Sequence, residues 1–264
     1  MHSVMNTKSD PAKSKESPAV SRQFASTARL LSADGFSRLQ AARVGVVGLG
    51  GVGSWAAEAL ARSGVGNFTL VDMDHVAESN INRQVQALHS TLGEAKAESL
   101  AKRMKEIHPA CNIQIVDDFL TAENASDILS ADHHDFWIDA TDDLKAKKAM
   151  ILVMQAQRRL VHLVVSGGAG GKTDPTRIEI ADLAQTSQDP LLSTLRYDLR
   201  KQHGFPRDRK MRISAVYCKQ PMIKGTDCDP SARLACAGYG SLVTVTAAMG
   251  LAAAAHVIQK ISGV

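Results

Sequence analysis

Three glycines spaced Gly48-x-Gly50-x-x-Gly53 separate a short apolar run from a helix-forming stretch in the segment RVGVVGLGGVGSWAAEAL, residues 43–60. In a strand–turn–helix unit, glycines at this spacing allow a tight turn, close approach of the backbone to a phosphate, and close packing of the helix on the strand. The free N–H groups at the start of the helix then face an anion. The pattern predicts a nucleotide-binding turn, and by itself it fits NAD as well as ATP.

Short β-branched runs alternate with amphipathic stretches, which predicts an α/β fold with a doubly wound, mostly parallel, Rossmann-like sheet. The predicted strands are Val44–Val47, Asn67–Val71, Ile113–Val116, Asp135–Asp139 and Leu160–Val165. The predicted helices are Trp55–Ser63, Gly93–Ile107, Ala122–Ser130 and Leu144–Arg159. After the glycine-rich segment SGGAGGKTDPT, we expect a strand over Arg177–Ile180 and a helix around Pro190–Gln202.

The composition is that of a globular protein with one sizeable domain. The chain has 264 residues, a net charge of +4 and four cysteines without a C-x-x-C pair, which argues against a structural zinc site or a disulfide framework. Residues 1–21 are rich in Ser, Lys and Pro and are expected to form a disordered tail, which leaves 22–264 as the domain. A reducing, cytoplasmic setting is expected.

The segment from Leu234 to Ile258 contains no Asp, Glu, Lys or Arg and is long enough to span a bilayer. It consists largely of Ala, Gly and Thr, and Ala and Gly contribute little transfer free energy. We therefore expect a strand or turn near Tyr239 followed by a tightly packed helix, without stable membrane insertion.

Polar and charged side chains follow the predicted second and fourth strands. Asp72 ends the second strand, where an acidic residue commonly binds ribose hydroxyls; Asn80, Arg83 and Lys96 come after it, and Asp142 stands in DATDD after the fourth strand. Because the carboxyl ends of neighbouring parallel strands meet in one crevice, these side chains are expected to converge. Two cations and a magnesium-holding carboxylate suit a triphosphate, so nucleotidyl transfer is favoured over NAD-dependent redox chemistry.

Several motifs extend this pattern beyond the nucleotide turn. The segments GLGGVG, VDMD, SNINRQ, GEAKAE and DATDD resemble the E1-like adenylating family, which includes the activators of ubiquitin-like proteins and of sulfur carriers. Residues 22–264 are most similar to the subgroup that acts on a modified adenosine of tRNA, through STARLL, VVDDF, SGGAGGKTDPT and DLAQTSQDPL. The resemblance implies the doubly wound sheet of the E1 adenylation type.

The resemblance also implies roles for individual residues. The ATP backbone contacts would come from Gly48, Gly50, Gly51 and Gly53, and the ribose contact from Asp72. The phosphates would be surrounded by Asn80, Arg83 and Lys96, of which Arg83 and Lys96 would be catalytic. Asp142 would hold Mg²⁺ and also act in catalysis. Members that are homodimers add an arginine from the partner's N-terminal segment, and Arg29 is the candidate here.

The implied reaction is an ATP-dependent, ligase-type dehydration. The threonyl carboxylate of threonylcarbamoyladenosine at tRNA position 37 would form an acyl-adenylate, and the side chain would then close into a ring. Two alternatives remain: an adenylyltransferase that activates the C-terminus of a small ubiquitin-like sulfur carrier, and an NAD-dependent oxidoreductase. The basic stretch Arg196–Arg212, with seven Lys or Arg and two Asp, is the candidate tRNA contact, and a sulfur-relay protein remains open as a further partner.

Some reactive residue types are expected to have ordinary structural roles. Cys218 and Cys236 are expected to be inert buried thiols, because no activating group stands beside them. Asp139 is expected to hold its loop, and the pair His133-His134 is expected to be solvated. The loop Ser166–Gly171 fits a substrate-binding segment and a flexible crossover equally well.

Overall fold

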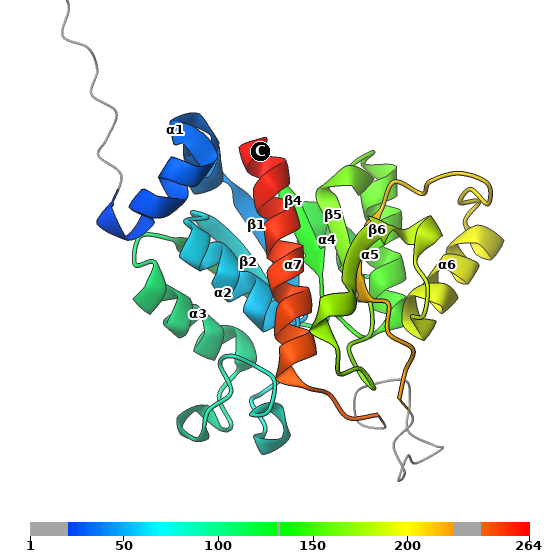
Figure 1. Ribbon diagram of the computed structural model, residues 1–264, viewed down its shortest axis with the longest axis horizontal. Coiled ribbons are helices and arrows are strands. Elements are labelled where there is room, and N and C mark those ends of the chain that lie inside the picture. Colours follow the sequence, from blue (N-terminus) through cyan, green and yellow to red (C-terminus); the bar gives the residue numbers. More distant parts are fainter. Residues whose placement is uncertain (1–20, 131–132, 224–238) are drawn as a thin grey trace, which may run out of the picture.

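A seven-stranded sheet forms the middle layer of the protein, with helices on both faces (Figure 1). The computed structural model describes residues 21–130, 133–223 and 239–264. The strand order is β3-β2-β1-β4-β5-β7-β6, and every neighbouring pair is parallel except β6 with β7. The strands are β1 (Arg43–Val47), β2 (Asn67–Val71), β3 (Asn112–Val116), β4 (Phe136–Asp139), β5 (Leu163–Ser166), β6 (Ile178–Asp182) and β7 (Ser214–Cys218). The predicted doubly wound, mostly parallel sheet is confirmed.

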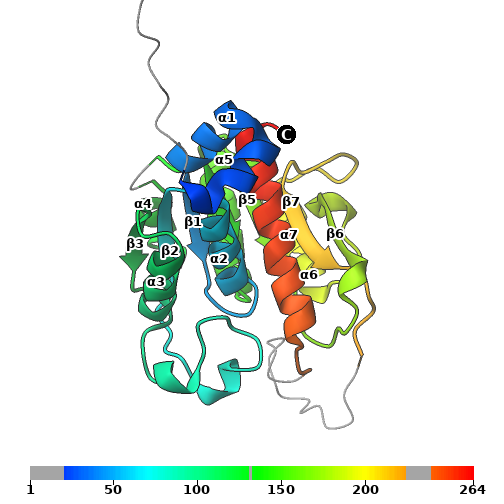
Figure 2. The ribbon, with the colours of Figure 1, turned by 60° about the vertical axis from the view of Figure 1, so that its left-hand side comes forward.

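Each face of the sheet carries its own apolar core. The helices are α1 (Ala25–Ala41), α2 (Gly53–Ser63), α3 (Lys96–Ile107), α4 (Ala125–Ser130), α5 (Leu144–Ala156), α6 (Pro190–Gln202) and α7 (Val243–Ser262). Buried side chains of α1, α2, α3 and α7 form one core, and those of α4, α5 and α6 form the other. Figures 1 and 2 show α7 lying across the first face beside α2. Helices α2 and α3 thus cover one face, α4, α5 and α6 cover the other, and α7 returns to the first, which leaves the carboxyl ends of the strands free for loops.

Most predicted elements are found, with differences at their ends. Helix α3 begins at Lys96 rather than Gly93, because Gly93 adopts φ 82°, and the residue before Lys96 is not helical. Strand β5 begins at Leu163, because the three residues before it form a 3₁₀ turn. Helix α1 and strand β7 were not predicted. A kink at Ser32, with φ 65°, interrupts α1, so the spacing of its apolar residues does not follow one continuous helical period and does not predict the helix.

In the Ala-rich segment, a turn at Tyr239 precedes α7, which confirms the expected turn and helix, while residues 234–238, including Cys236, lie outside the described residues. None of the helices described is long and apolar enough to cross a membrane. Small residues let α7 approach α2: a Cβ on Gly250 would overlap the carbonyl oxygen of Val52 and lie 2.9 Å from the Cβ of Trp55. The close packing of α7 on α2 therefore depends on the absence of a side chain at Gly250.

Replacing Gly250 by Ala tests this packing, because close contact and helix propensity predict changes of opposite sign in the free energy of unfolding. On an unhindered helix the change stabilises by about 1 kcal/mol, because Ala is the better helix former. Here we expect a net loss of about 1–3 kcal/mol in the free energy of unfolding, since the methyl group must push α7 away from α2. Urea unfolding followed by circular dichroism measures it. A Gly250→Ala protein more stable than the parent would contradict the close contact.

Candidate functional site

A cavity of about 620 Å³ opens at the carboxyl ends of β1, β2, β4 and β5. Of the site residues predicted from sequence, those that line it are Gly48, Gly50, Gly51, Asp72, Asn80, Arg83, Lys96 and Asp142. The structure thus brings together residues that are spread over nearly a hundred positions of the chain. Two predicted site residues, Gly53 and Arg29, do not line the cavity.

The glycines of the turn differ in what a side chain would contact at each position. Gly48 adopts φ 84°, and a Cβ there would lie 2.9 Å from the backbone of Ala140 and Thr141. A Cβ on Gly53 would overlap the carbonyl oxygen of Gly48, so Gly53 serves the packing of α2 on the turn. A Cβ on Gly50 would meet nothing within 4 Å, so this residue faces the open cavity. Backbone at Gly50 can therefore approach a ligand closely, as the fingerprint predicts.

Asp72 joins the end of β2 to the glycine turn. Its Oδ2 accepts a hydrogen bond from the backbone N–H of Leu49 at 2.6 Å, and its Oδ1 accepts one from the N–H of Asp74 at 2.9 Å. Burial raises the pKa of the Asp72 carboxyl, and the Leu49 hydrogen bond and the charge of Lys96 oppose that rise. The carboxylate is thus held rigidly at the cavity edge, next to the turn.

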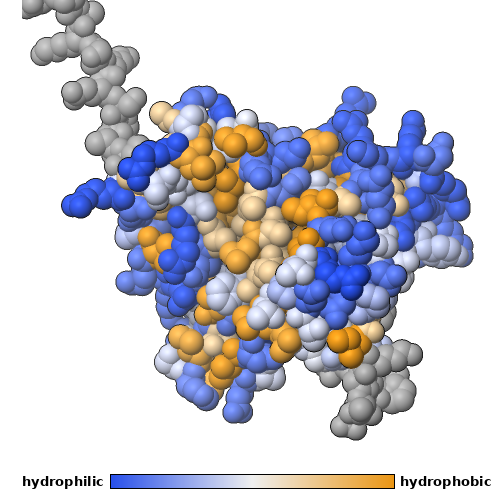
Figure 3. Space-filling model, in the orientation of Figure 1, coloured by the Kyte–Doolittle hydropathy of each residue, from blue (hydrophilic) through white to orange (hydrophobic). Residues whose placement is uncertain are grey.

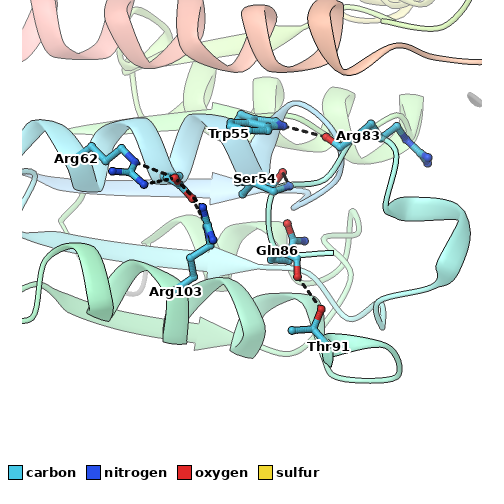
Figure 4. Close-up of polar contacts among 9 residues, drawn as sticks. Ser54, Trp55, Arg62, Arg83, Gln86, Thr91 and Arg103 are labelled. Carbon is cyan, nitrogen blue, oxygen red and sulfur yellow. Dashed lines mark hydrogen bonds and ion pairs between the residues drawn. The ribbon is translucent and has the colours of Figure 1, made fainter. Parts of the chain in front are cut away.

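The segment after β2 is attached to the turn and to α2 (Figure 4). The indole N–H of Trp55 donates to the backbone carbonyl of Arg83 at 2.9 Å. The side-chain amide of Gln86 donates to the backbone carbonyl of Leu49 at 3.0 Å. A Cβ on Gly51 would lie 3.2 Å from Cγ of Arg83, so the arginine side chain passes directly over the turn. Figure 4 shows its guanidinium pointing away from α2. These contacts explain how Arg83, a residue in irregular backbone, is held beside the glycine turn.

Lys96 and Asn80 complete this side of the cavity. The ammonium of Lys96 lies 2.6 Å from Oδ2 of Asp74, and its side chain is buried although that of Asp74 is 51% exposed. The Oδ1 of Asn80 accepts a hydrogen bond from the N–H of Ala77 at 3.1 Å, which shapes the loop. Lys96 therefore has an acidic partner that an anionic ligand would have to share.

Asp142 is exposed in the loop between β4 and α5, and a buried ion pair supports this loop. Oδ1 of Asp139 accepts hydrogen bonds from Thr141 N–H at 3.1 Å, Thr141 Oγ1 at 2.9 Å and Lys147 Nζ at 3.1 Å. Both charged side chains are fully buried. Asp143 caps α5 by accepting from two backbone N–H groups. The expected structural role of Asp139 is confirmed. The role of Lys147 was not predicted, because its place on the apolar face of a predicted helix was the one indication of it in the sequence.

A second buried ion pair lies beneath the opposite side of the cavity. Nζ of Lys172 lies 3.6 Å from Oδ2 of Asp189 and donates to the carbonyl of Cys218 at 2.6 Å. The same Oδ2 accepts a hydrogen bond from the N–H of Gly168 at 2.9 Å, and Asp189 also caps α6. Sequence reasoning missed both residues, although a lysine within a glycine-rich loop and an aspartate before a proline were visible signals.

The donor set suits a magnesium ion shared with a ligand better than a metal held by protein alone. Within the described ranges, no three or more His, Cys, Asp or Glu side chains are grouped to hold a metal ion. Mg²⁺ is commonly bound by one or two carboxylates together with phosphate oxygens. Asp142, exposed at the cavity, offers one such carboxylate.

Part of the basic stretch is used inside the protein. The guanidinium of Arg196 donates to the carbonyls of Leu183 and Thr186, and that of Arg200 donates to the carbonyl of Pro206. Lys201 is exposed and lies 5.4 Å from the ring of Tyr197. The exposed cations left for an external partner are Lys201, Arg207, Arg209, Lys210 and Arg212.

Other expected residues lie away from the cavity. Arg29 is exposed on α1, which leads into β1 and so stands at the opposite edge of the sheet. Cys218 is buried and donates to a backbone carbonyl, as expected of an inert thiol. The prediction for His134 is wrong: it is 1% exposed, its Nε2 lies 2.9 Å from Thr69 Oγ1, and its ring lies 4.2 Å from that of Trp137. The hydroxyl comes from β2, two strands from β4 in the sheet, so the local sequence around His134 does not predict the contact.

Replacing Lys147 by Met keeps much of the side-chain volume but leaves the buried Asp139 carboxylate without its cation. We expect the free energy of unfolding to fall by about 3–5 kcal/mol, as measured by urea unfolding. The adjacent Lys148 lies 4.0 Å from Asp198 and is 26% exposed, so Lys148→Met should cost less than about 1 kcal/mol. Equal effects of the two substitutions would contradict the supporting role of the Asp139–Lys147 pair.

Comparison with known proteins agrees with this geometry. The model of the ThiF family matches residues 20–264. The tRNA threonylcarbamoyladenosine dehydratase of Haemophilus influenzae is 44% identical over 246 residues, which cover 91% of this chain and 93% of the relative.

Solved structures are similar over the same length. The crystal structure of Escherichia coli tRNA N6-threonylcarbamoyladenosine dehydratase in complex with ATP matches with a TM-score of 0.83 and 39% identity, covering 92% of this chain and 94% of that one. The AMP complex of the same protein matches with a TM-score of 0.84 and 38% identity, covering 94% and 98%. Since the family model spans almost the whole chain, the chain belongs to the ThiF family.

Proposed function

We propose that the protein is an ATP-dependent dehydratase that cyclises the threonylcarbamoyl side chain of a modified adenosine at position 37 of tRNA. The observation that carries the proposal is the convergence of Arg83, Lys96 and Asp142 on the cavity that the glycine turn forms. A dinucleotide oxidoreductase has no need of two cations and an acidic side chain around its phosphates. The similarity to dehydratases over more than nine tenths of the chain supports the choice of substrate.

The chemistry explains why a nucleoside triphosphate is required. A free carboxylate is a poor electrophile, so one of its oxygens attacks the α-phosphate and pyrophosphate leaves. An amide nitrogen or oxygen of the same side chain then attacks the acyl carbon and loses its proton, the ring closes, and AMP departs with one carboxylate oxygen. The net result is the loss of one water from the nucleoside. Ring closure is intramolecular, so proximity contributes several kcal/mol without a covalent enzyme intermediate.

The residues divide these tasks. Backbone at Gly48, Gly50 and Gly51 contacts the phosphates, and Asp72 accepts hydrogen bonds from the ribose. Gly53 acts indirectly, by allowing α2 to pack on the turn. The cations Arg83 and Lys96 offset the negative charge that develops on the phosphates, with Asn80 beside them.

A magnesium ion fits this site, with Asp142 and the phosphate oxygens as its ligands. When bound, it neutralises charge on the triphosphate. Asp142 places its carboxylate at the cavity edge, and the buried Asp139–Lys147 pair keeps it there.

The proposal extends to partners. The exposed cations of the Arg196–Arg212 stretch give a surface for the phosphates of tRNA. In a homodimer, Arg29 of one protomer would reach the nucleotide of the other, which suits its exposed position away from its own cavity. A tRNA substrate supports a cytoplasmic location, and a sulfur-relay protein is a candidate for an additional partner.

Incubating the protein with ATP, Mg²⁺ and tRNA that carries threonylcarbamoyladenosine tests the assignment. Mass analysis of the nucleosides should show loss of one water, with one AMP and one pyrophosphate formed for each ring closed. AMP formation that depends instead on a small protein ending in Gly-Gly would favour the adenylyltransferase. Reduction of added NAD would favour an oxidoreductase.

Asp142→Asn keeps the shape of the side chain but removes its charge. We expect turnover to fall by about a hundredfold or more, because a charged group at the phosphates is lost. Asp127→Asn, an exposed change on α4, is the matched control and should leave turnover unchanged. Turnover by Asp142→Asn at the rate of the control would contradict the role given to Asp142.

The raised pKa of Asp72 predicts the pH dependence of ATP binding. The ionised form accepts hydrogen bonds from the ribose, so affinity should be full well above this pKa and fall as the pH drops through it. Because burial raises the pKa, the loss begins at a higher pH than for an exposed aspartate. Titration calorimetry between neutral and mildly acidic pH measures it. Asp72→Asn should bind about tenfold or more weakly and show no such loss, whereas an unchanged pH profile would contradict the assignment.

A further inference from the structure

The cavity has two chemically different sides. The charged side carries the turn after β1, the segment after β2 and Asp142 after β4. The other side is formed by the last residue of β5 and the loop after it, which we call the glycine wall: Ser166, Gly167, Gly168, Ala169 and Gly170. All five residues are uncharged, and Leu191 of α6 lines the cavity beside them. Among the described residues that line the cavity, the cations are Arg83 and Lys96, both on the charged side.

The glycine wall is held in one shape from beneath. Oδ2 of Asp189 accepts the N–H of Gly168 at 2.9 Å, and a Cβ on Gly167 would overlap that same oxygen. Lys172, with Asp189, forms an ion pair in which each side chain is 1% exposed. Backbone that rests directly on a buried ion pair has little freedom to rearrange. The wall is thus a built surface, which favours the substrate-binding interpretation over a flexible crossover.

One residue of the wall points into open space. A Cβ on Gly168 would meet nothing within 4 Å, and its φ lies outside the left-handed region, so neither strain nor packing requires glycine there. Gly50 has the same property on the charged side. Two glycines on different sides of one cavity therefore face its interior without any structural need to lack a side chain. A ligand that approaches the backbone closely is a physical reason for glycine at such positions.

We propose that the glycine wall binds the nucleoside whose carboxylate is adenylated, an inference that rests on the proposed function. Strand β5 is two strands from β1, a separation of roughly 10 Å, so the wall borders the nucleotide side without overlapping it. A nucleobase and its ribose are uncharged and suit a flat surface of small residues and backbone groups. The attached carboxylate reaches the α-phosphate without first meeting a cation that would pair with it. A base in a single-stranded tRNA loop can be splayed out into such a site.

Paired substitutions of the two open glycines test the proposal. Gly168→Val should raise the KM for the modified tRNA by about tenfold or more, because added methyl groups fill the nucleoside space, and leave the Kd for ATP within about twofold. Gly50→Val, the matched variant on the other side, should instead weaken ATP binding. Gly168→Ala should give an intermediate KM. Leu191→Trp, which fills the same space from α6, should reproduce the KM effect and covers the case in which Gly168→Val fails to fold.

The outcomes separate the inference from the proposed function. If wild-type protein converts the tRNA but Gly168→Val and Leu191→Trp keep its KM, the nucleoside binds elsewhere and the inference is wrong. If Gly168→Val weakens ATP binding as much as Gly50→Val does, the wall belongs to the nucleotide site and the inference is again wrong. If wild-type protein binds ATP but never dehydrates the tRNA, the proposed function fails, and the inference fails with it.

Discussion

The site depends on backbone segments approaching closer than a side chain would allow. Gly53 touches the carbonyl of Gly48, Gly48 lies against the loop after β4, and Gly250 brings α7 onto α2. Each contact needs the absence of a Cβ, and each fixes one wall of the cavity relative to another. Because these contacts join β1, β4, α2 and α7, the turn cannot shift without moving the layer that covers it.

Two buried ion pairs hold loops that line the cavity. The pairs Asp139–Lys147 and Lys172–Asp189 each lie under a loop that lines the cavity, one after β4 and one after β5. Burying an ion pair is costly, and such pairs are weak contributors to stability unless hydrogen bonds satisfy the remaining atoms. Here Oδ1 of Asp139 and Oδ2 of Asp189 accept backbone N–H groups of the loops above them, whereas Oδ2 of Asp139 is buried without a hydrogen-bond partner among the described residues. Their position favours a role in fixing loop geometry rather than in adding stability.

The sequence predicted the parts of the structure that follow from local order along the chain. The alternation of strands and helices set the sheet, and the rule that parallel strands end at one edge brought Asp72 and Asp142 together. What it could not predict depends on partners distant in sequence. His134 is buried because Thr69, on a strand two places away in the sheet, reaches its ring. Arg196 turns inward because carbonyls of an earlier loop accept its guanidinium. In both cases the residue type alone favours an exposed side chain, and contacts with segments distant in the sequence override that preference.

The lining of the cavity extends from Val47 to Thr246, and Thr246 of α7 lies beside Gly51. A nucleotide in this cavity would therefore act as a noncovalent cross-link between the first strand of the chain and its last helix. Occupancy would lower the population of every partly open form that separates α7 from the turn, by mass action. Amide hydrogens in the middle of α7, some distance from any phosphate, would then exchange more slowly whenever the cavity is filled.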